Sequence, residues 1–311
     1  MNNQQHYQIG ITENLSQSAY YLLFSLVDES MLSQAVEVLA EEIDGQSVIL
    51  GLGEALMDKN NDVFYHPYKA KGNAIKLAPE EKGYDLALWV KANDLGDLFH
   101  RVNNLIQQLA PAFEVKDIVQ GITHHFYEKD GDMINHGLDE FEDGTENPQG
   151  NDITLTAIAD HGASYWSLQK WQHDFSKLNR MQRNEKERLI GRSLEDNHEF
   201  DDNEPQAHVK RTGQESFEPE AFLWRRSMPW IEQSNQTLIG GLMFSSFAAS
   251  FYPFDAQFNR MVGNEDDIID GVFKFSKVCY SAFFYCPPMK DNQVDLSCLL
   301  AFQVNEVAKE S

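Results

Sequence analysis

The sequence predicts an α+β protein made of two similar halves, each with an antiparallel sheet and peripheral helices. The length of 311 residues is enough for two domain-sized units around a large core. A hydrophobic fraction of 42% and an aromatic fraction of 12% are typical of a folded globular chain. Strand-like and helix-like patterns of apolar residues also alternate along the first half, and the second half repeats the plan.

The first half divides into six elements. Residues 30–44 and 93–109 carry apolar side chains at helical spacing, for example Leu98, Val102 and Leu105 in the second segment. Strand patterns occupy 19–27, 47–56, 84–91 and 112–128. The order is therefore β-α-β-β-α-β, which is the order of a ferredoxin-like unit.

The second half follows a comparable order. Residues 240–262 share a plan with residues 84–106: a strand, a short loop, and then a helix with a Phe and a basic residue. We therefore expect an N-terminal ferredoxin-like half over 1–130, a linker and acidic loop over 131–150, and a C-terminal ferredoxin-like half over 151–311. The apolar stretch 238–254 is interrupted by serines and Pro253, which favours buried sheet over a membrane span.

Charge and cysteine content exclude several classes of partner. The formal net charge of -24 repels phosphate backbones, so we expect no nucleic acid partner, and it favours cationic donors at the surface. No basic residue precedes Lys59, so no export signal is expected. The three cysteines, without CxxC spacing, indicate reduced thiols in a cytoplasmic protein. No membrane partner is expected either, because the stretch 238–254 reads as buried sheet.

Several short segments concentrate side chains that can carry chemistry. The stretch FEDGTENPQG (141–150) has turn residues around Asp143. His208 begins the run HVKR at the end of a second, separate acidic stretch over 193–208. WRRSMPW places Arg225 and Arg226 in a strand pattern, so one of them points inward and needs an anionic partner. That partner is either a carboxylate such as Asp143 or an anionic ligand. His124 and His125 are adjacent in a strand pattern and are expected on opposite faces.

These segments together resemble the dye-decolourising peroxidases, a family of haem proteins, and the compact length resembles the family's bacterial intracellular class. FEDGTENP is similar to the family's aspartate-glycine motif, although Glu140 stands where the family usually has glycine. The resemblance continues in order through the second half, in GASYWSLQKWQHDFSKLN (162–179), ERLIGR (187–192), AHVKR (207–211), WRRSMPW (224–230) and GLMFSSFAASFYPFDAQFNRMVG (241–263).

The resemblance implies roles for particular residues. One haem b per chain would be held mainly by the second half, with His208 as axial ligand of the iron and Asp270 behind it. Asp143, Arg225 and Ser227 would lie on the other face of the haem as the catalytic group, and Arg226 would point away. Gly144, Thr145 and Glu146 would follow the haem edge, and Arg192 would bind a haem propionate.

The implied activity is reduction of hydrogen peroxide through a ferryl intermediate, with oxidation of dyes, phenols or other one-electron donors. Asp143 would move the peroxide proton, and Arg225 would keep Asp143 ionised at mildly acidic pH, so activity is expected to favour acidic pH. The alternative is a haem-binding or haem-handling protein whose peroxidase activity is incidental. The resemblance also implies a homo-oligomer.

Overall fold

The computed structural model describes residues 6–57, 74–77, 82–125, 127–129 and 132–299. The helices in the first part of the chain are α1 (Leu32–Glu42), α2 (Ala74–Leu77) and α3 (Leu95–Leu109). The four long strands of this half are β1 (Ser18–Leu26), β2 (Val48–Leu52), β3 (Leu86–Ala92) and β4 (Phe113–Ile122). A small three-stranded sheet follows, formed by β5 (Tyr127–Lys129), β6 (Asp132–His136) and β7 (Glu142–Asp143).

The second half begins with α4 (Asp152–Ala157) and the long strand β8 (Ser164–His173). Three short helices come next: α5 (Phe175–Leu178), α6 (Arg183–Ile190) and α7 (His208–Thr212). The remaining elements are β9 (Trp224–Arg225), β10 (Met228–Ser234), β11 (Thr237–Ala248), α8 (Tyr252–Met261), the 3-10 turn η5 (Gly271–Lys274), β12 (Ser276–Cys286), β13 (Met289–Lys290) and β14 (Gln293–Val294).

The two halves share one sheet that closes on itself. The strand order is β10-β4-β1-β3-β2-β12-β8-β11-β9, and β10 also pairs with β11. The order β4-β1-β3-β2 is that of a ferredoxin-like half, and the β12-β8-β11-β10 set repeats it. The halves meet at two seams of one residue pair each, Tyr285 with Leu52 and Trp230 with Gly121. A Cβ on Gly121 would lie 3.0 Å from both Met228 and Tyr21, so glycine allows the strands to approach at this seam.

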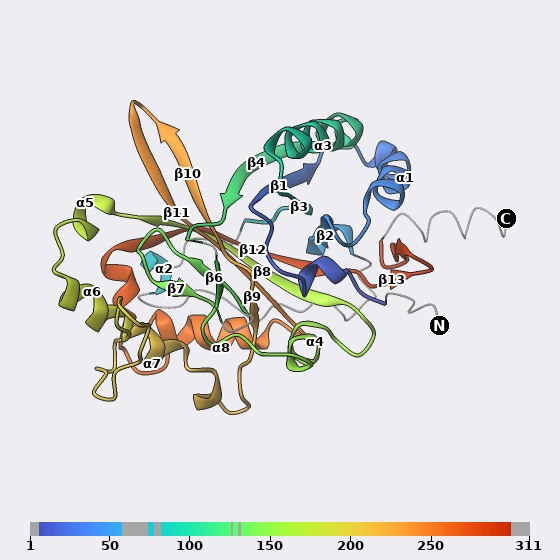
Figure 1. Ribbon diagram of the computed structural model, residues 1–311. Helices are drawn as coiled ribbons and strands as arrows, with labels where there is room; N and C mark the ends of the chain where they lie inside the picture. Colours follow the sequence, from blue (N-terminus) through green and yellow to red (C-terminus); the bar gives the residue numbers. More distant parts are fainter. Residues whose placement is uncertain (1–5, 58–73, 78–81, 126, 130–131, 300–311) are drawn as a thin grey trace.

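Helices cover the outside of the closed sheet on two sides. In Figure 1, α1 and α3 lie together against the first half, whereas α6, α7 and α8 lie against the second. The interior is filled by large aromatic side chains in contact, among them Tyr21, Trp89, Trp166 and Phe247. On the second side, Phe254 of α8 packs against β11 and β12, and Phe258 of α8 packs against Trp171 of β8. The functional cavity lies in this second helix layer.

The predicted elements of the first half are confirmed, with shifts at their ends. Residues 112–128 form a strand only to Ile122, so His124 and His125 lie beyond it. The prediction that their rings point to opposite faces is therefore wrong, since the two imidazoles stack with centroids 4.1 Å apart. The sheet predicted over 238–254 ends at Ala248, because Pro253 lies in the first turn of α8.

The three cysteines are free thiols, as the sequence predicted. Among the described residues, no helix combines the length and the apolar content needed to cross a bilayer.

Candidate functional site

A cavity lies between the outer face of the second-half sheet and the helices α7 and α8. Alternate side chains of a strand share one face, so β8 presents Gln169, Trp171 and His173 to this cavity. The apolar part of the lining comes mainly from β11 and α8, through Leu242, Phe244, Phe254, Phe258 and Met261. The walls can therefore enclose a large apolar ligand.

His208 is the first residue of α7 and projects into the cavity. Its Nδ1 atom lies 2.8 Å from Oδ2 of Asp270, whose side chain is completely buried. The other carboxylate oxygen of Asp270 accepts a 2.8 Å hydrogen bond from the backbone N–H of Val272, which fixes the carboxylate. When Nδ1 of the neutral ring carries the proton and donates to Asp270, Nε2 carries the lone pair.

The contact with Asp270 also shifts the pKa of His208. Burial lowers the pKa of the imidazole, but the Asp270 carboxylate raises it by its charge and its hydrogen bond, and the net shift is upward. Asp270 therefore makes the ring more basic, which strengthens Nε2 as an electron-pair donor.

Asp143 and Arg225 enter the cavity from another wall. Asp143 ends β7, where it pairs with Asn135 of β6, and Arg225 ends β9, where it pairs with Ser246 of β11. The side-chain amide of Asn147 joins the two segments: it donates to the Arg225 carbonyl at 3.0 Å and accepts from the Arg225 N–H at 2.9 Å. Asn147 therefore holds the acidic loop against β9.

The electrostatics of this wall are set by burial. Burial raises the pKa of Asp143 and outweighs Arg225, Ser227 and Arg226, which all act to lower it. Burial also lowers the pKa of Arg225, and its Nε atom is buried without a hydrogen-bond partner among the described residues. Arg225 acts on Asp143 in the expected direction, but the carboxyl group does not become more acidic than an ordinary aspartic acid.

The acidic loop has three residues with positive φ, Glu140, Gly144 and Gly150. Gly144 has φ +83°, and its carbonyl accepts a 2.9 Å bond from the Asn147 N–H, so the turn needs glycine here. Glu140 has φ +81°, a conformation that glycine adopts without strain. The residue that departs from the family motif therefore keeps a backbone path suited to glycine. Its carboxylate lies 3.6 Å from Lys186 Nζ, an exposed ion pair that is a weak compensation.

We expect Glu140→Gly to raise the free energy of unfolding by about 1 kcal/mol, because a non-glycine residue in this conformation costs about 1–2 kcal/mol. Chemical denaturation of the two proteins measures the difference. Asn235→Gly is the matched control, since Asn235 also has positive φ but asparagine tolerates it, and a smaller effect is expected. Equal effects of both substitutions, or a loss of stability in Glu140→Gly, would contradict this explanation.

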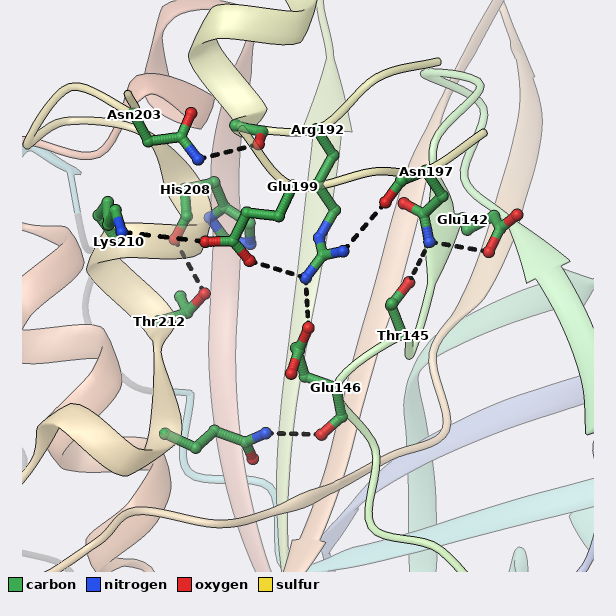
Figure 2. A network of polar contacts seen from close by, with 12 residues as sticks. Glu142, Thr145, Glu146, Arg192, Asn197, Glu199, Asn203, His208, Lys210 and Thr212 are labelled. Atoms are coloured by element: carbon green, nitrogen blue, oxygen red, sulfur yellow. Dashed lines mark hydrogen bonds and ion pairs between the residues drawn. The ribbon is translucent and has the colours of Figure 1, made fainter. Parts of the chain in front are cut away.

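A network of ion pairs lies at the rim, between the acidic loop and α7 (Figure 2). Arg192 bonds the carboxylate of Glu146 and, at 3.0 Å, that of Glu199. Glu199 in turn lies 3.9 Å from Lys210 of α7. Asn197 donates 2.8 Å bonds to Glu142 and Thr145, so the loop 193–203 is tied to the acidic loop.

The residues singled out from the sequence fall into two groups. Asp143, His208 and Arg225 line the main cavity, with Asp270 directly behind His208. The others lie around it: Gly144, Thr145 and Ser227 line an adjoining polar cavity that also includes Asp143, Arg225 and Arg226. Arg226 does not line the main cavity; it donates to the Glu13 carbonyl at 3.0 Å and stacks on Trp224. Arg192 and Glu146 bond each other at the rim.

Several important residues were missed in the sequence. Asn147 belongs to FEDGTENP, and its position before Pro148 was interpreted only as turn chemistry. His173 was not singled out from the sequence, yet it lines the cavity. The alternation of Gln169, Trp171 and His173 along β8 is a signal that could have identified this face.

Comparison with known proteins gives consistent findings. Residues 135–291 match the family model described as "Dyp-type peroxidase, C-terminal". A dye-decolorizing peroxidase of Rhodococcus erythropolis is 27% identical over 299 residues, which cover 88% of this chain and 84% of that protein.

Two solved structures illustrate the similarity of the fold. A putative Dyp-type peroxidase from Shewanella oneidensis has a TM-score of 0.75 and 23% identity, covering 93% of this chain and 97% of that one. A DypB variant from Rhodococcus jostii RHA1 in complex with heme has a TM-score of 0.74 and 22% identity, covering 88% of this chain and 94% of that one.

Proposed function

The chain belongs to the Dyp-type peroxidase family, and from this premise we propose that His208, Asp143 and Arg225 carry its activity. As a member of that family it is a haem-dependent peroxidase, which reduces hydrogen peroxide while oxidising a one-electron donor. The observation that carries the residue assignment is that one apolar cavity contains a fixed imidazole with a free Nε2 on one wall and a carboxyl–guanidinium pair on another.

The residues of the cavity fit a haem. The apolar side chains of β11 and α8 suit the faces of a porphyrin, and a neutral imidazole nitrogen is a common ligand of haem iron. Arg225 also brings a buried nitrogen with no hydrogen-bond partner among the described residues, which is costly unless a polar ligand compensates. His208 would hold the iron, and Asp270 would fix the ring and increase its electron donation.

The chemistry that haem supplies when bound is a site at which peroxide is reduced to water. Around that site, Asp143 takes the proton from one peroxide oxygen at its carboxylate and returns it to the other oxygen, which then leaves as water. Arg225 provides fixed positive charge where negative charge develops as the O–O bond breaks. Ser227 lines the polar cavity together with Asp143, where its hydroxyl can donate to the carboxylate and favour the ionised form.

We propose that Arg192 binds a haem propionate from the rim, beside Gly144, Thr145 and Glu146 at the haem edge. Its guanidinium has a planar donor arrangement that suits carboxylates, and two carboxylates, those of Glu146 and Glu199, already occupy it. A propionate would therefore join or replace Glu146 or Glu199.

The test of the function is the stoichiometry of the haem-loaded protein. One equivalent of hydrogen peroxide, followed by an excess of a one-electron donor, is expected to oxidise two equivalents of donor and to return the starting spectrum. Binding of haem followed only by slow bleaching with peroxide would favour the alternative, a haem-handling protein with incidental peroxidase activity.

The raised pKa of Asp143 opposes the expectation that activity favours acidic pH, because burial outweighs the effect of Arg225 on the carboxyl group. The base must be ionised, so the peroxide reaction is expected to fall as the pH drops through a pKa that lies above the ordinary value of 3.8. Arg225→Ala removes the largest charge that lowers this pKa, so the peroxide reaction of the variant is expected to fall at a higher pH than that of the wild type. Stopped-flow rates across pH measure this fall in both proteins. A wild-type rate that does not fall at low pH would contradict the role of Asp143. So would a fall at the same pH in the wild type and in Arg225→Ala.

We also propose a cytoplasmic location, where the three unpaired thiols remain reduced. A homo-oligomer is proposed as well, supported by the exposed side chains of Leu95 and Phe99 on α3. Light scattering of the purified protein tests the oligomer, and a monomer at all concentrations would contradict it. The division at residues 130 and 150 remains a proposal supported by the repeated strand order.

A further inference from the structure

A second opening adjoins the haem cavity at the end of the sheet. His173, the last residue of β8, and Ser276, the first residue of β12, are cross-strand partners. Both line the main cavity, and both also line a separate groove at the surface, called here the outer groove. The remaining walls of this groove come from α5, the β10–β11 hairpin and η5, which lie at one side of the molecule in Figure 1.

The His173–Ser276 pair separates the two spaces. Both residues are buried, with 8% and 6% of their surface exposed, and His173 Nδ1 lies 2.5 Å from Ser276 Oγ. The structure records no hydrogen bond to His173 Nε2 from the described residues. Burial lowers the pKa of His173, opposed by Asp139, and a neutral ring has a free acceptor when Nδ1 donates to Ser276. The pair is thus a polar contact in a wall that is otherwise aromatic, formed by Phe175 and Phe275.

The outer groove also has a charge opposite to that of the chain. Lys274 and Lys277 line it, against the single carboxylate of Asp174, which caps α5 by accepting from the Lys177 N–H. The whole chain has a net charge of -24, so a locally positive groove is a clear exception. Its apolar surface comes from Leu238, which is 73% exposed, and from Ile239 and Phe273.

We propose that the outer groove binds the reducing substrate, which is a phenol with an anionic substituent, and that His173 at the floor of the groove accepts the phenolic proton. The inference rests on the proposed peroxidase function. The apolar side chains would contact the aromatic ring, and Lys274 and Lys277 would bind the anionic substituent. The Nε2 atom of His173 would face the hydroxyl group, with the haem cavity directly behind the imidazole.

The reaction balances with peroxide as the oxidant. Each phenol gives one electron to the oxidised centre that peroxide produces and its O–H proton to His173 Nε2, and becomes a phenoxyl radical that keeps its anionic substituent. Two phenols supply two electrons and two protons, and one hydrogen peroxide leaves as two molecules of water. His173 passes each proton on to the cavity and returns to its neutral form for the next phenol.

The first test compares two phenols that share a ring and differ in charge, 4-hydroxyphenylacetate and tyramine. In the haem-loaded Lys274→Glu/Lys277→Glu variant, kcat/KM for 4-hydroxyphenylacetate is expected to fall about tenfold at low ionic strength, and that for tyramine to rise. Equilibrium binding of 4-hydroxyphenylacetate to the resting enzyme should weaken in parallel. The control is Lys116→Glu/Lys290→Glu, which makes the same change in net charge at exposed positions outside the groove. Equal effects of both variants, or no effect of either, would overturn the proposal.

The second test concerns the proton. His173→Gln retains a polar side chain but is not a base, so kcat for the phenol is expected to fall about a hundredfold. Ferrocyanide gives an electron without a proton, so its oxidation should change little in the same variant. Equal losses with both donors would show that His173 has only a structural role and would overturn the proton step. The reaction with peroxide alone is measured in parallel; its absence in wild type would instead refute the peroxidase function itself.

Discussion

Replacing His208 by alanine is expected to remove the axial ligand and to weaken haem binding by more than a hundredfold. His208→Ala also leaves the buried Asp270 carboxylate without its imidazole partner, so Asp270→Asn is measured beside it as a second variant. That substitution keeps the ligand and removes only the charge behind it, and substitutions of such supporting groups cost about 10–100-fold in metal affinity. Haem titration followed by the Soret absorbance measures both.

His198→Ala is the matched control for the His208 variant, since His198 is exposed in the neighbouring loop. It should bind haem as the wild type does. Retention of a wild-type Soret band in His208→Ala would mean that another residue holds the iron, and the assignment of the whole cavity would then be wrong.

The second large effect is expected at Arg225. Arg225→Ala should lower the rate constant of the peroxide reaction by about 10²–10³, the usual cost of removing one preorganised group that stabilises developing charge. Arg225→Lys keeps the positive charge but loses the planar donor arrangement, so an intermediate rate is expected. Single-turnover stopped-flow with limiting peroxide separates this step from donor oxidation. A wild-type rate in Arg225→Ala would assign the step to Asp143 alone.

Asp143→Asn completes the comparison, because it removes the base and keeps the shape. Folding raises the pKa of Asp143, so this group costs stability progressively as the pH rises from its ordinary pKa through its folded-state pKa. Asn lacks that cost, and the variant is expected to melt no earlier than the wild type at neutral pH. A loss of peroxide reactivity in a protein of unchanged stability would therefore come from the missing base.

Local patterns explain why much of the fold could be predicted. The helix α3 has an N-cap at Asp94, which accepts from the N–H groups of Gly96 and Asp97, and a buried stripe that includes Leu98 and Leu105. Such signals lie within a few residues of one another. The two seams at Leu52 and Gly121 join residues that are distant in the chain, and no periodicity encodes them. The closed sheet was therefore not foreseen.

The site shows the same division between local and long-range information. Asp143, His208 and Arg225 stand in short motifs, and the structure brings them to one cavity. The raised pKa of Asp143 depends on how deeply the acidic loop is buried, which the sequence does not express. The pairing of Arg192 with Glu199 and the contact of His173 with Ser276 depend on tertiary packing as well.

The central claim is that one cavity holds haem between His208 and the Asp143–Arg225 pair. A crystal structure of the haem-loaded protein tests it most directly. We expect the iron bound to Nε2 of His208, the Nδ1–Asp270 bond retained, and Asp143 and Arg225 on the opposite face of the porphyrin. Haem bound elsewhere, or iron held by a residue other than His208, would contradict the account.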